Sequence, residues 1–156
     1  MLLGAHSISL DQKGRIAIPT KYRDAINEQC GGRFVCTIDI QNPCLLLFPL
    51  NNWEKLEQKL SKLSSTNPLE SKLQRILLGY ASDCELDASG RILIPLTLRN
   101  YAKLTKELML VGQLNRFEIW SSTVWNDRIA EDLMSIPTEN WSNSERLKDF
   151  SLNDYE

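Results

Sequence analysis

The stretch Asp11-Gln12-Lys13-Gly14-Arg15-Ile16-Ala17-Ile18-Pro19 returns 76 positions later as Asp87-Ala88-Ser89-Gly90-Arg91-Ile92-Leu93-Ile94-Pro95. Six of the nine positions are identical, namely the Asp, the Gly, the Arg, both Ile residues and the Pro. Self-similarity at a fixed spacing is typical of a duplicated structural unit. The chain is therefore predicted to contain two copies of one unit of about 50 residues.

Each copy predicts the same series of elements. Polar and apolar residues alternate before and after Gly14, which indicates two short strands joined by a tight turn. Pro19 ends the second strand and suits the first turn of a short helix, which Gly31 and Gly32 close. Two further strands are expected at 34–38 and 45–48, so each unit is β-turn-β-α-β-β.

The repeat can be followed beyond the nine-residue stretch. At the same spacing, residues 34–38 align with residues 110–114. When four residues are removed from the following connection, Cys44 to Trp53 aligns with Arg116 to Trp125.

The fold class follows from the small size of one unit. A single unit has little core and leaves strand edges unpaired. We therefore expect a mixed α/β (α+β) fold, in which the duplicated units form one pseudo-twofold intertwined β barrel with peripheral helices. The expected boundaries are 1–52 for the first repeat, 53–80 for a helical insert, 81–124 for the second repeat, and 125–156 for a C-terminal helix and acidic tail.

The insert is predicted to hold two helices. Asn51 or Asn52 can cap the first, whose apolar stripe begins at Trp53, and Pro68 can occupy the first position of the second. These stripes are interpreted as surfaces for helix packing or subunit contact.

Charge is unevenly distributed along the chain. The net charge is −2, but residues 127–156 carry −5 and the remaining residues carry +3. The repeats are thus mildly basic and the tail is acidic. Nothing resembles a signal peptide or the roughly 18 apolar residues of a membrane span, so we expect a cytoplasmic protein without a membrane partner.

Several classes of function are disfavoured. The four cysteines have no close-paired metal spacing and His6 is the only histidine, so we expect no metal site and no cofactor. Glycine-rich phosphate loops and nucleophile-elbow sequences are missing. We therefore expect that the protein is not an enzyme.

The motif Asp-x-x-x-Arg, present twice within Asp-x-x-Gly-Arg-Ile-x-Ile-Pro, resembles that of the MraZ family of bacterial transcriptional regulators. The resemblance covers nearly the whole chain, including Cys36 to Leu50 and Leu77-Leu78-Gly79. Each half is similar to a unit of the AbrB/SpoVT swapped-hairpin superfamily. The resemblance implies an intertwined β fold, a homo-oligomeric ring, and binding to repeated G-rich elements in the promoter of the division and cell-wall gene cluster.

The resemblance and the residue chemistry together suggest the candidate DNA-binding residues. An Arg fork can contact guanine bidentately or grip phosphate, which makes Arg15 and Arg91 the leading candidates. Their neighbours in the two turns complete the candidate site: Lys13, Gly14, Ser89 and Gly90. Alternatively, each Arg only pairs with its own Asp and braces the turn.

Other polar residues are expected to support the turns. Asp11 and Asp87 are predicted to organise them by accepting backbone N–H bonds. Arg23 and Arg99 are possible phosphate contacts, although a salt bridge on the helix surface is the simpler interpretation.

The leading hypothesis is thus a sequence-specific double-stranded DNA-binding regulator, expected to repress its own gene cluster and to associate with the nucleoid. Multivalent contacts across a ring would strengthen binding by a weakly basic subunit. The alternatives are a protein-interaction scaffold and an antitoxin-like module that uses the duplicated loops and the acidic tail.

Overall fold

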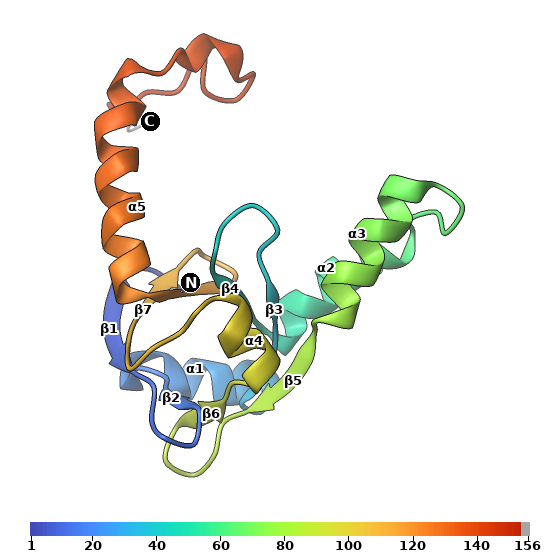
Figure 1. Cartoon of the computed structure of the whole chain (residues 1–156), viewed down its shortest axis with the longest axis vertical. Coiled ribbons are helices and arrows are strands. Elements are labelled where there is room, and N and C mark those ends of the chain that lie inside the picture. Colours follow the sequence, from blue (N-terminus) through green and yellow to red (C-terminus); the bar gives the residue numbers. More distant parts are fainter. Residues whose placement is uncertain (154–156) are drawn as a thin grey trace. The chain divides into compact units, whose positions relative to one another are not determined.

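The computed structural model describes residues 1–153, and the acidic residues Asp154 and Glu156 of the predicted tail lie outside this range. The chain divides into one unit of Met1–Trp125 and a second of Asn126–Glu156. The first contains both repeats (Figure 1). No helix within 1–153 is long and apolar enough to cross a membrane.

Both repeats have the predicted order of elements. The first consists of β1 (Ala5–Ser9), β2 (Arg15–Ala17), α1 (Thr20–Cys30), β3 (Arg33–Ile38) and β4 (Leu45–Pro49). The second consists of β5 (Ser82–Glu85), β6 (Arg91–Leu93), α4 (Leu96–Tyr101), β7 (Glu107–Gly112) and β8 (Phe117–Ser121). Between them lie α2 (Leu50–Ser61) and α3 (Pro68–Gly79), and α5 (Ser122–Ser135) follows.

The strands of the two repeats are intertwined. Six strands form an antiparallel sheet in the order β1-β7-β8-β4-β3-β5, so the first strand of each repeat pairs with the other repeat. The strands β2 and β6 form a separate two-stranded ribbon. If each strand is replaced by its equivalent in the other repeat, the same strand order is obtained, read from the opposite edge of the sheet. The two repeats are therefore related by the predicted pseudo-twofold symmetry. The symmetric pairs Ile16↔Ile92 and Leu46↔Glu118 lie at its centre.

The expected barrel is not closed. Within residues 1–153, β1 and β5 end the sheet on opposite sides, and no pairing joins them. The strands that could have continued the sheet, β2 and β6, are only three residues long and pair with each other instead. Because their pairing satisfies both short strands across the axis, the fold is an open sheet with a ribbon packed on it.

The alignment of the two repeats needs one correction. Cys36 lies opposite Leu47, whereas Leu110 lies opposite Ile119. Since Leu47 and Ile119 are equivalent, Cys36 corresponds to Leu110 and not to Gly112, as the sequence alignment predicted. The physical origin is that α4 has five residues fewer than α1, whereas the connection that follows it, residues 102–106, is three residues longer than residues 31–32 after α1. The second repeat is therefore two residues shorter between β6 and β7. A two-residue shift keeps every side chain on the same face of the sheet, so alternation could not reveal it.

The two faces of the sheet pack against different elements. One face buries the ribbon, α1 and α4, with Ile16, Ile92 and Phe117 almost completely inaccessible. On the other face, α2 and α3 pack against the sheet, and Trp53 of α2, which is 4 % exposed, contacts Phe48. Trp120 is also buried there and meets the ring of Trp125, whose centroid is 5.6 Å away.

The helix boundaries differ slightly from those expected. The first insert helix begins at Leu50 after Pro49, so Asn51 and Asn52 lie inside it and do not cap it. Asn67 caps α3 by accepting the N–H groups of Leu69 and Glu70, and Pro68 occupies the first position as predicted.

The second unit contains the end of α5 and two short 3-10 helices, Ile136–Thr138 and Trp141–Asn143. The indole N–H of Trp141 donates to the carbonyl of Ile136, and its ring lies 6.1 Å from that of Phe150. Part of the predicted tail is therefore locally folded.

Candidate nucleic-acid interface

The loop between β1 and β2 is built around the carboxylate of Asp11. Its Oδ1 accepts the backbone N–H groups of Lys13 at 2.9 Å and Arg15 at 2.8 Å. The N–H of Gly14 donates to the Asp11 carbonyl at 3.0 Å. Gly14 has φ 84°, a left-handed conformation that an L side chain strains. Asp11 and Gly14 thus close the turn together, one by accepting N–H groups and the other by its left-handed backbone.

The loop between β5 and β6 repeats this geometry. Oδ1 of Asp87 accepts the N–H groups of Ser89 at 2.8 Å and Arg91 at 2.9 Å. Gly90 has φ 75° and donates its N–H to the Asp87 carbonyl. The duplicated sequence therefore folds twice into the same turn.

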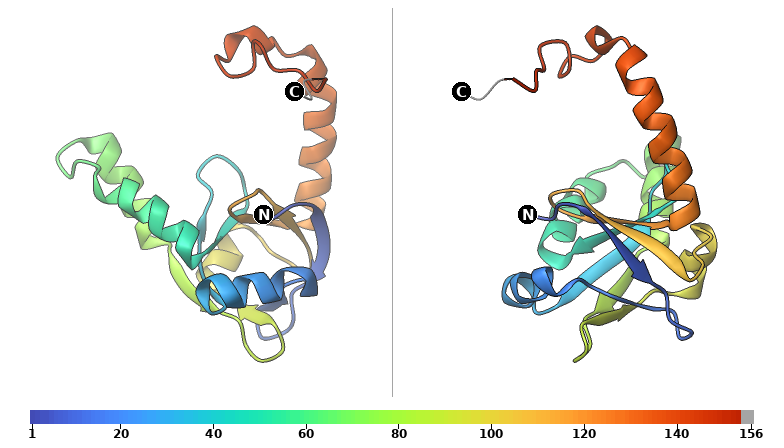
Figure 2. Two further views of the ribbon diagram at one scale, coloured as in Figure 1. Left: turned by 180° about the vertical axis from the view of Figure 1, so that it is seen from behind. Right: turned by 90° about the vertical axis from the view of Figure 1, so that its left-hand side faces the viewer.

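The two loops lie at the same end of the first unit, beside the ribbon (Figures 1 and 2). Two reciprocal backbone hydrogen bonds join them. Ile18 N–H donates to the carbonyl of Gly90 at 3.0 Å, and Ile94 N–H donates to that of Gly14 at 2.9 Å. The two turns are consequently parts of one hydrogen-bonded structure.

The arginines of both loops converge on one carboxylate. Nε of Arg15 lies 2.9 Å from Oδ2 of Asp11, and Nη1 of Arg91 lies 3.8 Å from the same oxygen. Their side chains remain 31 % and 43 % exposed, respectively. Arg15 therefore pairs with the Asp of its own loop, whereas the ion pair of Arg91 crosses to the other loop. Both guanidinium groups are left within reach of a ligand.

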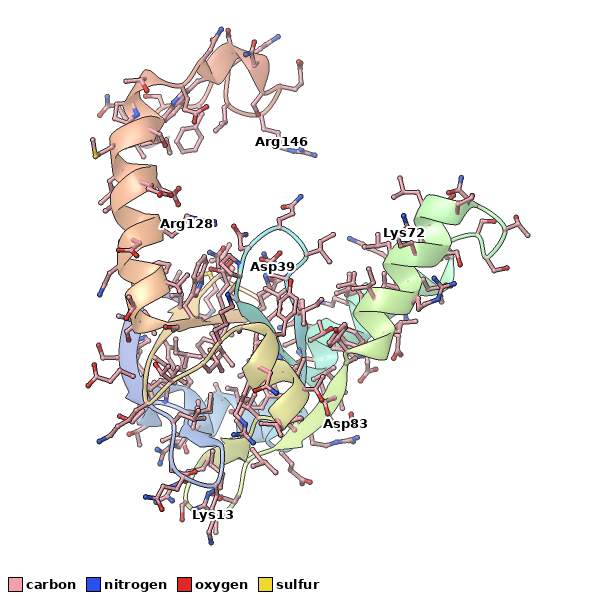
Figure 3. The ribbon with its side chains drawn as sticks, in the orientation of Figure 1. Lys13, Asp39, Lys72, Asp83, Arg128 and Arg146 are labelled. Atoms are coloured by element: carbon pink, nitrogen blue, oxygen red, sulfur yellow. The ribbon has the colours of Figure 1, made fainter. Side chains whose placement is uncertain are left out.

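The remaining loop residues differ between the copies. Lys13 is exposed and lies at the outer end of the first loop (Figure 3), and the equivalent Ser89 is also exposed. Gly14 and Gly90 are buried, because another side chain lies against each of them.

Hydrogen bonding lowers the pKa of both aspartates. For Asp11 the N–H of Arg15 has the largest effect, supported by the Arg15 side chain and the N–H of Lys13. For Asp87 the N–H of Arg91 has the largest effect, followed by that of Ser89. Both carboxylates are therefore ionised at neutral pH, and each accepts backbone N–H groups, which reduces its repulsion of an anionic ligand.

The arginines of the helices cross between the two loops. Nε of Arg23 donates to the carbonyl of Ile18 at 2.6 Å, and its guanidinium lies against Gly90 of the other repeat. Nε of Arg99 donates to the carbonyl of Ile94 at 2.8 Å and lies against Gly14. Neither Arg forms an ion pair with a residue in 1–153, so the expected surface salt bridge is not what holds them.

Sequence reasoning placed these two arginines on the helices but missed their contact with the opposite turns. A signal was available, since each Arg recurs at the spacing of the repeat together with a glycine that leaves room for it. The sequence did not show that each Arg packs against the glycine of the other repeat rather than that of its own.

Within residues 1–153, one group of side chains has the chemistry of metal ligands. Ligand atoms of Asp39, Cys44 and Glu118 lie within 4.8 Å of one another. Burial raises the pKa of the Cys44 thiol, and the Glu118 and Asp39 carboxylates raise it further. The thiol is consequently protonated in the protein without a metal. Glu118 also accepts the indole N–H of Trp120, so the cluster is satisfied internally.

Comparisons with known proteins agree with the duplicated architecture. A family model described as "MraZ protein, putative antitoxin-like" matches the chain twice, over residues 1–76 and 77–148. A protein of Tolumonas auensis named transcriptional regulator MraZ is 59 % identical over 97 % of this chain and its own full length. Proteins of the same name from Psychromonas ingrahamii and Klebsiella pneumoniae are 58 % and 55 % identical over the same shares.

These names describe transcriptional regulators rather than enzymes, in line with the expectation from the sequence. The similarity extends over both repeats and most of the tail, at 55–59 % identity to these three relatives. The chain therefore belongs to the MraZ family.

Proposed function

We propose that this protein is a transcription regulator that binds double-stranded DNA in a sequence-specific manner through its two Asp-x-x-x-Arg loops. The observation that carries the proposal is the convergence of Arg15 and Arg91, from separate repeats, at one carboxylate on an exposed edge. The relatives named as transcriptional regulators support the same conclusion.

The geometry suits contact with neighbouring sites on DNA. Both guanidinium groups reach the same oxygen of Asp11, so they are close enough to contact adjacent base pairs, which follow one another about every 3.4 Å along the helix axis. A guanidinium can donate two bonds to guanine O6 and N7. G-rich elements are thus the targets we propose for Arg15 and Arg91, with Lys13 on a phosphate.

Affinity would come from several subunits acting together. One subunit offers few basic side chains at this surface, whereas a homo-oligomeric ring would present the loop pair repeatedly to promoter repeats. We propose such a ring, and repression of the protein's own division and cell-wall gene cluster by occupation of its promoter. The protein would then reside in the cytoplasm in association with the nucleoid.

Binding to a duplex of the DNA upstream of the gene, measured by fluorescence anisotropy at two salt concentrations, tests the proposal. Arg15→Ala and Arg91→Ala should each weaken specific binding by about 5- to 150-fold per contact, the effect of losing a bidentate contact. Lys13→Ala should weaken binding to all sequences alike and reduce the salt dependence by about one unit of slope.

The matched control is Arg75→Ala, which removes an exposed Arg from α3, an element outside the loop pair. It should bind as the unchanged protein does. If both loop variants bind DNA normally and only unfold at lower temperature, the two arginines brace the turns and the proposed site is wrong.

A further inference from the structure

Each helix arginine contacts the glycine turn of the opposite repeat. Arg23 follows β2 in the first repeat and lies against Gly90 in the second, and Arg99 follows β6 and lies against Gly14. A Cβ at position 14 would lie 2.7 Å from Cζ of Arg99 and 2.9 Å from its Nε. The guanidinium groups therefore occupy the space that the absent side chains leave free.

The arginines are fixed in these positions by the chain itself. Nε–H of each one donates to a carbonyl five residues earlier, that of Ile18 or Ile94. The N–H of the same residue donates to the carbonyl of the opposite glycine. Each Arg therefore links the end of its own ribbon strand to the turn of the other repeat by a hydrogen bond and by packing.

We infer that Arg23 and Arg99 are positioning residues that hold the two loops as one rigid pair. Each acts on the loop of the other repeat: Arg23 orients the turn that carries Arg91, and Arg99 orients the turn that carries Arg15. The inference rests on the proposed function for its consequence, because a rigid pair pays less conformational entropy when both arginines bind DNA. The bracing itself is a property of the protein without DNA.

The crossed pattern gives a test that a general loss of stability would not reproduce. Hydrogen exchange of the loop amides reports local opening of each turn. In Arg23→Ala, the amides of Ser89 and Arg91 should exchange about tenfold faster, while those of Lys13 and Arg15 change little. In Arg99→Ala the pattern should be reversed. Arg75→Ala should alter neither turn.

DNA binding to the upstream duplex separates positioning from direct phosphate contact. Arg23→Lys keeps the charge but loses the planar group against Gly90 and the placement of its Nε donor. We expect Arg23→Lys and Arg23→Ala to weaken binding alike, by about tenfold, with an unchanged salt slope. In the Arg91→Ala background, Arg23→Ala should weaken DNA binding little further, because the residue that it positions is already missing. In the Arg15→Ala background, Arg23→Ala should still weaken binding by more than it does in the Arg91→Ala background.

The outcomes distinguish the bracing from the proposed function. If Arg23→Lys binds normally and Arg23→Ala loses a unit of salt slope, Arg23 contacts phosphate and the inference is overturned. Equal loosening of both loops in Arg23→Ala would also overturn it. If the crossed exchange pattern appears but even the unchanged protein does not bind the duplex, the bracing stands and the proposed DNA target fails.

Discussion

Substitution of Gly14 by Ala would test how the loop pair is packed. Two costs add at this position. Gly14 has a left-handed backbone, and placing a residue with a Cβ there costs about 1–2 kcal/mol of conformational energy. The new methyl would also overlap the Arg99 guanidinium at 2.7 Å, against an ordinary carbon contact of about 3.5–4.0 Å.

The guanidinium can move away, so the second cost is the hydrogen bond that it loses. Nε of Arg99 donates to the Ile94 carbonyl at 2.8 Å in a half-buried setting, which is worth about 1 kcal/mol. We therefore expect Gly14→Ala to lower the free energy of unfolding by about 2–3 kcal/mol. At this chain length that corresponds to a fall in Tm of roughly 4–12 °C.

Gly31→Ala is the matched control. Gly31 has φ 64°, yet nothing lies within 4 Å of the position that its Cβ would take. Gly31→Ala should therefore lower the free energy of unfolding only through the strain of the left-handed backbone, by about 1–2 kcal/mol. Unfolding by urea at one fixed protein concentration compares the two variants, since any association would make the midpoint depend on concentration.

A double variant identifies the origin of the difference. With Arg99→Ala already present, Gly14→Ala should cost no more than Gly31→Ala, because the overlap has been removed. If Gly14→Ala is as mild as Gly31→Ala in the unchanged background, Arg99 does not occupy the space beside Gly14 and the packing argument is refuted.

Two further predictions concern titratable groups. The folded state lowers the pKa of Asp11 and Asp87, so both carboxylates stabilise the protein above their ordinary pKa of 3.8. This stabilisation is lost as the pH falls from 3.8 through the lower pKa values of the folded state, and urea unfolding between pH 6 and 3 should show the loss. A loss of equal size in Asp11→Asn would contradict the prediction. Alkylation with iodoacetamide at pH 8, followed by mass spectrometry, should label the half-exposed Cys30 before the three buried cysteines, whose thiol pKa burial raises, to about 12 for Cys84; rapid labelling of Cys84 in the folded protein would contradict this.

The local structure of the loops could be predicted because it depends on neighbours in the chain. Asp11 accepts N–H groups from residues two and four positions later, and Gly14 supplies the left-handed conformation. All of these are encoded within five residues and occur twice. The start of α3 could also be predicted from local sequence, because Pro68 occupies the first position of that helix.

Longer-range features were predicted less well. The duplicated unit and its unpaired edges correctly indicated intertwining, but not whether the sheet would close. Closure depended on the partner of β2, a strand of three residues whose own sequence fits either a barrel or a separate ribbon. The shift between Cys36 and Leu110 escaped for a related reason, since a two-residue change preserves the alternation of buried and exposed positions.

The sequence by itself determined the repeat, the order of elements in each copy, the turn chemistry and the family, because each depends on residue identity over short spans or on similarity along the whole chain. Only the tertiary structure decided which loop each Arg serves. Arg91 pairs with Asp11, and Arg23 packs against Gly90, across separations of 80 and 67 residues. Such contacts arise from the exchange of strands between repeats, and no local pattern specifies an exchange of identical partners.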